Sequence, residues 1–147
     1  MNLLLGIGNE LNGDDAVGCY IARNFRSEGW QTIDCGTVPE NYIGVVKRIK
    51  PELLVIIDAA EMGLQAGAIR RLKKEYASSA FISTHSLPLK EFISAIEKYA
   101  KKILLIGIQP KQTSLGTPLS SEAKGAAAKL MEILEQEKWL KIEEFRE

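Results

Sequence analysis

Apolar runs and helical stripes alternate along the chain, and this alternation predicts an α/β fold. Three apolar runs, over residues 2–8, 53–58 and 103–108, have the length and the flanking turn residues of buried strands. Residues 30–35 are predicted to form a short second strand, and the more charged residues 68–72 an edge strand. Four segments with apolar residues at helical spacing cover residues 15–26, 38–49, 88–96 and 120–137. Strands that alternate with helices in this way predict a sandwich with a mainly parallel sheet and helices on both sides, in one domain over residues 1–147.

Composition and charge remove several classes of protein. Nineteen basic side chains balance nineteen acidic ones, so the net charge gives no reason to expect a nucleic-acid partner. The longest apolar runs, such as residues 53–57, are far shorter than a membrane span, so we expect no membrane insertion. Cys19 and Cys35 lack the spacing of a metal or redox motif. They are expected to be reduced, buried thiols of a cytoplasmic protein.

Polar residues at the ends of the predicted strands are the first candidates for a site, because parallel sheets bind ligands at their carboxyl edge. The segment GIGNELNGDD follows the first strand at residues 6–15. It is not a dinucleotide fingerprint, since Leu11 stands where the third glycine is required. The segment ends in an acidic pair, Asp14 and Asp15. One of the two is expected to cap the next helix, which leaves the other carboxylate facing out of a strand-end loop.

Two further candidates follow later strands. Asp58 ends a buried apolar strand, where a carboxylate is costly unless it is paired, hydrogen-bonded or bound to a metal. His85 is the single histidine and lies in a loop before a helix, where it is either incidental or part of a site. A serine triad with Ser83 or Ser86 lacks the strand-to-helix elbow that places such a nucleophile. Two carboxylates and one imidazole from separate loops instead suit an open, weak site for Ni²⁺ or Zn²⁺.

These residues lie in stretches that resemble the hydrogenase maturation endopeptidases. The resemblance is strongest to the branch that processes the large subunit of formate-hydrogenlyase-type and related membrane-bound [NiFe] hydrogenases. The matching stretches span most of the chain and occur in the same order as in the family. The residues beyond Lys138 cannot be aligned with the family. The matching stretches are GIGNELNGDDAVG (6–18), GTVPEN (36–41), PELLVIIDAAEMG (51–63), STHSLPL (83–89) and GIQP (107–110).

The resemblance implies a fold, a reaction and a set of site residues. The fold is a three-layer α/β/α sandwich with a twisted five-stranded sheet, mainly parallel, with one antiparallel strand. The reaction is removal of a C-terminal extension from the large-subunit precursor after nickel insertion. Asp15, Asp58 and His85 are expected to form the catalytic, metal-binding site, with Asn9 and Asp14 beside them as substrate contacts.

The same resemblance implies where the metal and the partner come from. The nickel is expected to arrive on the precursor and to bind the free protein weakly or not at all, so that cutting is coupled to nickel loading. The partner is the hydrogenase large-subunit precursor, and the protein itself is expected to be a monomer. A chaperone that checks the precursor for nickel and cuts nothing is the alternative, because the same site would serve it.

Overall fold

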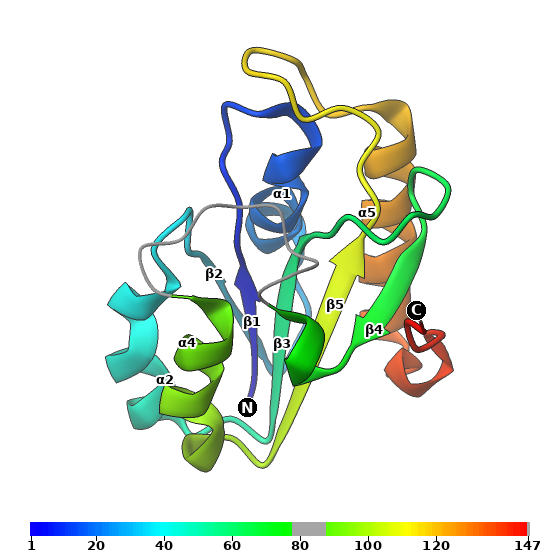
Figure 1. The fold of residues 1–147 in the computed structure, drawn as a ribbon. Coiled ribbons are helices and arrows are strands. Elements are labelled where there is room, and N and C mark those ends of the chain that lie inside the picture. Colours follow the sequence, from blue (N-terminus) through cyan, green and yellow to red (C-terminus); the bar gives the residue numbers. More distant parts are fainter. Residues whose placement is uncertain (78–87, 147) are drawn as a thin grey trace.

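A five-stranded sheet forms the centre of the computed structural model, which describes residues 1–77 and 88–146. Within those residues the strand order is β2-β1-β3-β5-β4 (Figure 1). Four strands are parallel, and β4 pairs antiparallel with β5. This confirms the expected mainly parallel sheet with one antiparallel strand. The strands are β1 (Asn2–Gly6), β2 (Trp30–Asp34), β3 (Leu53–Ala59), β4 (Ile69–Leu72) and β5 (Lys102–Ile108).

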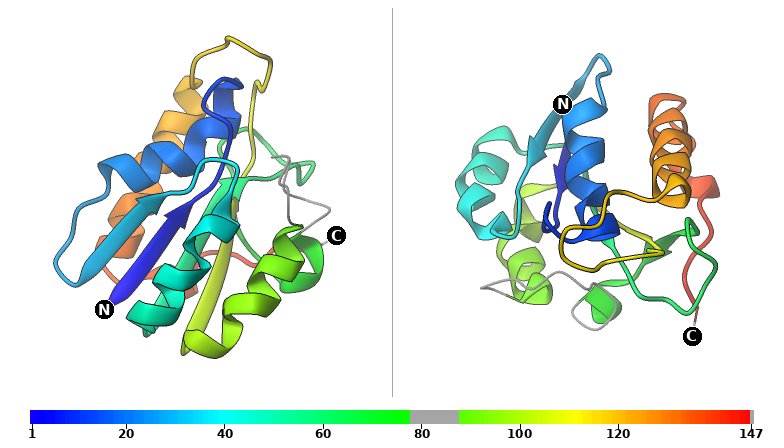
Figure 2. Two further views of the ribbon diagram at one scale, coloured as in Figure 1. Left: turned by 90° about the vertical axis from the view of Figure 1, so that its left-hand side faces the viewer. Right: turned by 90° about the horizontal axis from the view of Figure 1, so that it is seen from above.

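Helices cover both faces of the sheet and complete three layers (Figure 2). Apolar residues of α1 and α5 pack against one face, and those of α2 and α4 pack against the other. The side chains of β1 show why both faces are buried, since Leu4 contacts the α1 and α5 layer while Leu3 and Leu5 contact the opposite one. The helices are α1 (Val17–Asn24), α2 (Ile43–Ile49), α4 (Leu89–Ile96) and α5 (Ser121–Glu135).

Two of the expected helices begin later than the apolar periodicity suggests. A 3-10 helix over Gly13–Ala16 precedes α1, and another over Pro39–Tyr42 precedes α2. The tighter turn places Asp14 and Asp15 on a separate element in front of α1, where both are buried. Periodicity alone does not reveal this change, because a 3-10 turn and a first α-turn have similar apolar spacing.

The connections around β1 create the point at which the strand order reverses. β1 lies between β2 and β3, and α1 and α2, which follow β1 and β2 in the chain, pack on opposite faces of the sheet. The α1 backbone lies directly on the sheet here, since a Cβ at Gly18 would be 2.3 Å from the Ile57 carbonyl oxygen and 2.6 Å from that of Ile7. The carboxyl ends of β1 and β3 therefore open side by side, which is the usual ligand position of such sheets.

The C-terminal segment is docked along the outer edge of β4. The Arg71 N–H donates to the Glu143 carbonyl at 2.9 Å, and the Phe145 N–H donates to the Arg71 carbonyl at 2.8 Å. Ile142 is buried, and the Phe145 ring meets that of Tyr76 edge to face at 5.5 Å. Residues 142–145 thus cover an edge that would otherwise present unpaired backbone groups. Among the described helices, none has the length and apolar character needed to cross a membrane.

Candidate active site at the carboxyl edge

Asp58 lies at the carboxyl end of β3 and is fully buried, with 0% exposure. Its Oδ1 atom accepts a hydrogen bond from the Ala59 N–H at 2.7 Å. The loop after β1 starts beside it, because the Ile7 N–H donates to the Ile57 carbonyl at 2.9 Å. Asp58 therefore lies at the junction of β1 and β3, where the strand order reverses.

Asp15 comes to the same edge from the 3-10 helix Gly13–Ala16, which packs against β3. Its side chain is 4% exposed, and its Oδ2 atom accepts a hydrogen bond from the Asn9 N–H at 3.3 Å. The loop after β1 passes closely over this turn, since a Cβ at Gly8 would be 1.8 Å from the Asp15 carbonyl oxygen. The Asn9 side chain holds the loop, because its Oδ1 atom accepts from the Leu11 N–H at 2.9 Å.

The third residue of the expected site, His85, lies outside the described residues, as do Ser83 and Ser86. Its convergence with the two carboxylates stays a prediction. Residues 1–77 and 88–146 contain no cluster of three metal-ligating side chains of their own. Among these residues, Asp15 and Asp58 are buried carboxylates at the carboxyl edge, and such groups can bind a cation or accept a proton.

A buried cysteine, Cys19, which the sequence did not single out as part of a site, lies near Asp34 and Asp58. The Cys19 Sγ atom is 3.5 Å from the Gly8 carbonyl oxygen. Burial, a hydrogen bond to Asp34 and the negative charges of Asp34 and Asp58 all raise the pKa of the Cys19 thiol. The thiol therefore stays protonated at neutral pH and acts as a small apolar group and weak donor, not as a nucleophile.

Asp34, at the end of β2, carries the neighbouring negative charge. Burial acts to raise its pKa, but hydrogen bonds from the Cys19 thiol and the Gly36 N–H outweigh burial and hold the pKa below its usual range. The Gly36 N–H lies 3.0 Å from the Asp34 Oδ1 atom, and the Arg23 guanidinium is 3.8 Å from Oδ2. Asp34 is thus an ionised neighbour of the site whose charge is balanced from the α1 side.

Asp14 has a different environment from Asp15. Its buried carboxylate accepts four hydrogen bonds: from the Lys111 N–H at 2.8 Å, the Gln112 N–H at 3.3 Å, and both the N–H and the hydroxyl of Ser120 at 2.7 Å. The expectation that Asp14 or Asp15 caps the next helix is wrong, since neither the 3-10 helix nor α1 has a side-chain cap. Asp14 connects the first loop to the loop before α5, and its expected contact with substrate stays a prediction.

Gln109 holds the loop that follows Asp58, and the sequence reasoning gave it no role of its own. Its buried Oε1 atom accepts from the Met62 N–H at 2.8 Å and from the Leu64 N–H at 3.3 Å. Its Nε2 atom donates to Glu61 at 2.8 Å, and this hydrogen bond, together with that of the Gly63 N–H, lowers the pKa of Glu61. The stretch GIQP was the available signal, because it places a polar residue directly after a buried strand.

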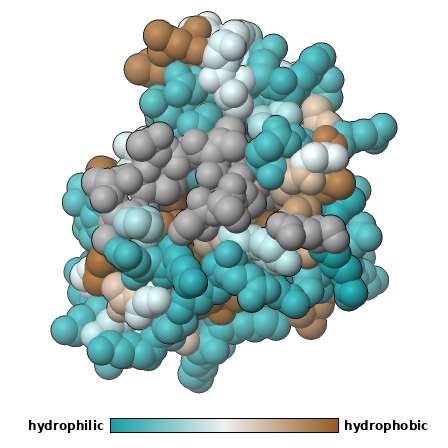
Figure 3. All heavy atoms as spheres, in the orientation of Figure 1, coloured by the Kyte–Doolittle hydropathy of each residue, from teal (hydrophilic) through white to brown (hydrophobic). Residues whose placement is uncertain are grey.

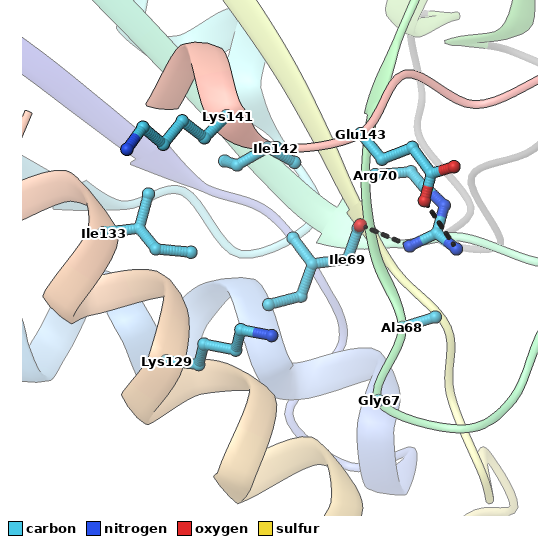
Figure 4. A pocket seen from close by; sticks show the side chains of 9 residues that line it. All are labelled: Gly67, Ala68, Ile69, Arg70, Lys129, Ile133, Lys141, Ile142 and Glu143. Carbon is cyan, nitrogen blue, oxygen red and sulfur yellow. Dashed lines mark hydrogen bonds and ion pairs between the residues drawn. The ribbon is translucent and has the colours of Figure 1, made fainter. Parts of the chain in front are cut away.

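A separate cavity of about 280 Å³ lies between β4, α5 and the C-terminal segment (Figure 4). The Arg70 guanidinium on its wall is 3.3 Å from the Glu143 carboxylate and donates to the Ile69 carbonyl at 2.9 Å. Neither Asp15 nor Asp58 lines this cavity. The cavity and the carboxyl edge are therefore different places on the molecule.

Comparison with known proteins identifies a family with this fold. The family model described as hydrogenase maturation protease matches residues 16–137. The hydrogenase 3 maturation protease of Escherichia coli is 31% identical over 138 residues, which are 91% of this chain and 88% of the relative. The solution structure of the Escherichia coli endopeptidase HycI has a TM-score of 0.88 at 29% identity and covers 99% of this chain and 97% of its own. The crystal structure of a [NiFe] hydrogenase maturation protease from Thermococcus kodakarensis has a TM-score of 0.80 at 31% identity, covering 94% and 92%.

Proposed function

The chain belongs to the hydrogenase maturation protease family, and we propose that it is an endopeptidase that removes the C-terminal extension of a [NiFe]-hydrogenase large-subunit precursor. The observation that supports this most directly is the pair of buried carboxylates at the carboxyl edge. Asp15 comes from the segment that follows β1 and Asp58 from the carboxyl end of β3, at the point where the strand order reverses. Buried carboxylates of this kind can bind a divalent cation or accept a proton from water.

The nickel in this proposal belongs to the substrate. Asp15, Asp58 and His85 would contact nickel already inserted in the precursor, and the ligands of the precursor would complete the coordination shell. The site offers too few ligands to hold nickel firmly by itself, so a nickel-free precursor lacks the interaction that aligns it. When bound, the metal supplies Lewis-acid chemistry, which polarises a carbonyl or acidifies a water molecule.

A second candidate, a chaperone that binds the nickel-loaded precursor and leaves it uncut, would use the same two carboxylates. It makes the same prediction for metal recognition, and it differs in one observable. Under the endopeptidase proposal the mass of the precursor falls by the mass of the C-terminal peptide. Under the chaperone alternative the mass of the precursor stays constant while a complex forms.

The test is intact mass spectrometry of the precursor after incubation with the purified protein. One sample contains the nickel-loaded precursor and a parallel sample contains the nickel-free precursor. Asp15→Asn, Asp58→Asn and His85→Ala are the site variants. Glu143→Gln is the matched control, because it removes a carboxylate charge at the separate cavity.

We expect loss of the C-terminal peptide from the loaded sample alone, with the wild type and with Glu143→Gln. The three site variants should leave the precursor uncut while keeping the wild-type circular dichroism spectrum. Cutting of both samples would remove nickel recognition from the proposal. Full activity of His85→Ala would contradict the proposal that His85 forms a site with the two aspartates. A precursor that is bound but stays uncut would favour the chaperone alternative.

A further inference from the structure

Exposed apolar side chains gather at the edge of the sheet that carries the two aspartates. Among the described residues, five large apolar side chains are exposed, and three of them, Leu11, Val38 and Leu115, lie on the loops that follow β1, β2 and β5. Figure 3 shows apolar atoms at the tip of the molecule that projects beyond the sheet. Single exposed apolar residues are normal on a protein surface, but adjacent ones at the rim of a site indicate contact with another molecule.

Leu11 and Leu115 belong to two loops that are joined to each other. The Gly116 N–H donates to the Leu11 carbonyl at 2.7 Å, so the two leucines lie at the same tip although they are far apart in sequence. Their side chains are 65% and 77% exposed. The loop after β5 and the segment after β1 run together at the top of Figure 1, beyond the ends of the strands.

The tip is ordered by its own hydrogen bonds and not by a helix or a strand. The Thr117 hydroxyl donates to the Ser114 carbonyl at 2.6 Å, and the Gln112 side-chain amide donates to the Pro118 carbonyl at 2.8 Å. The Asp14 N–H donates to the Gln112 carbonyl at 2.7 Å and fixes the base of the loop. A surface that is already ordered loses little conformational entropy when a partner binds to it.

We propose that Leu11 and Leu115 form an apolar docking ridge that binds an apolar surface of the hydrogenase large-subunit precursor. The inference rests on the proposed function, because it takes that precursor as the partner. Continuity with the site supports it: the loop that carries Leu11 continues within four residues into Asp15. A protein substrate whose peptide reaches Asp15 and Asp58 must lie over this edge, and the loops that carry the two leucines extend beyond the ends of the strands there (Figure 1).

The experiment compares the double variant Leu11→Ser, Leu115→Ser with the control Leu140→Ser. Leu140 is 61% exposed, so its substitution removes a similar apolar surface, but it lies on the 3-10 helix Trp139–Lys141 near the C-terminus (Figure 1). Three quantities are measured with the nickel-loaded precursor: KM and kcat for cleavage, and the Kd of the complex. For the double variant we expect KM and Kd to rise about tenfold or more with kcat within about twofold of wild type. The melting temperature and the Leu140→Ser values should stay at wild type.

The outcomes separate the ridge from the proposed function. A wild type that cleaves, together with a double variant of unchanged KM and Kd, overturns the ridge and keeps the endopeptidase. An equal loss of binding in Leu140→Ser also overturns it, since the effect would then not depend on the carboxyl edge. A wild type that binds without cleaving, with binding lost only in the double variant, keeps the ridge and overturns the endopeptidase. A wild type that neither binds nor cleaves overturns both.

Discussion

The Asp14 carboxylate accepts two hydrogen bonds from Ser120, one from the backbone N–H and one from the hydroxyl, both at 2.7 Å. Ser120 is also the N-cap of α5, where its Oγ atom accepts from the Ala123 N–H at 3.1 Å. One carboxylate thus ties the turn in front of α1 to the start of the last helix. The position of Asp15, the next residue along the chain, depends on this connection.

Substitution of Asp14 by asparagine is expected to destabilise the fold. An amide can replace one carboxylate oxygen, but its NH₂ group would then face either the Ser120 N–H or the two N–H groups and the hydroxyl that donate to the other oxygen. Leaving buried donors unsatisfied should lower the free energy of unfolding by about 2–4 kcal/mol. The measurement is urea unfolding followed by circular dichroism.

Ser120→Ala is the matched control for this prediction. It removes the hydroxyl that donates to Asp14 and caps α5, and it keeps the backbone N–H, so we expect a smaller loss of about 1–2 kcal/mol. An Asp14→Asn protein with wild-type stability that no longer binds the precursor would contradict the structural role. It would support the substrate contact expected from the resemblance.

Two helical glycines should respond to alanine with opposite signs. A Cβ at Gly18 would meet the carbonyl oxygens of Ile57 and Ile7, which belong to backbone that cannot move aside, whereas a Cβ at Gly125 would meet nothing within 4 Å. Gly18→Ala should therefore cost about 2–3 kcal/mol through overpacking. Gly125→Ala should gain about 0.5–1 kcal/mol through helix propensity. Thermal unfolding of both variants tests this, and a neutral Gly18→Ala would contradict the close packing of α1 on the sheet.

The sheet could be predicted from the sequence because its signal is local. Residues 53–57 and 103–108 carry no polar side chain, as strands buried on both faces require. The predicted strands 53–58 and 103–108 become β3 and β5, each with one end moved by one residue. The placement of candidate residues at strand ends follows from the same pattern, since parallel strands end at one edge. The candidate residues at the carboxyl ends of β1 and β3 could therefore be identified without any knowledge of their partners.

The roles of individual polar residues could not be predicted, because their partners are distant in sequence. In the sequence nothing distinguishes Asp14 from Asp15. In the structure Asp14 accepts hydrogen bonds from Lys111, Gln112 and Ser120, which lie about a hundred residues further along the chain. Gln109 likewise holds a loop 45 to 48 residues away. Spacing and periodicity contain no information on such contacts.

The stability of the fold should fall with pH in the alkaline range because of Cys35. Burial, with a smaller contribution from the charge of Asp34, raises the pKa of the Cys35 thiol from its ordinary value of 9.0 to about 12. Between these two values the unfolded chain has lost the thiol proton while the folded chain keeps it. The contribution of this thiol is therefore complete below about pH 9 and is lost as pH rises toward 12, by about 1.4 kcal/mol per pH unit.

The measurement is urea unfolding of the wild type and of Cys35→Ala at pH 7 and at pH 10. Other groups titrate in the same range, so the informative quantity is the difference between the two proteins. The wild type should lose more stability than the variant between the two pH values. An equal loss in both proteins would show that the Cys35 thiol is not the group that resists ionisation.

Removal of residues 142–147 should destabilise the fold and cause association through the β4 edge. The truncation deletes the buried Ile142 and the hydrogen bonds that Glu143 and Phe145 form with Arg71, so we expect a loss of about 2–4 kcal/mol. It also exposes backbone groups of β4 that can pair with a second molecule. Light scattering over a range of protein concentrations should show a monomer for the full chain and concentration-dependent association for the truncated one.

Phe145→Ala is the control for this prediction, because it removes the contact with Tyr76 and keeps the backbone cover of β4. It should lower the stability without causing association. If that variant also associates, the Phe145 ring and not the backbone cover of β4 would be what prevents association.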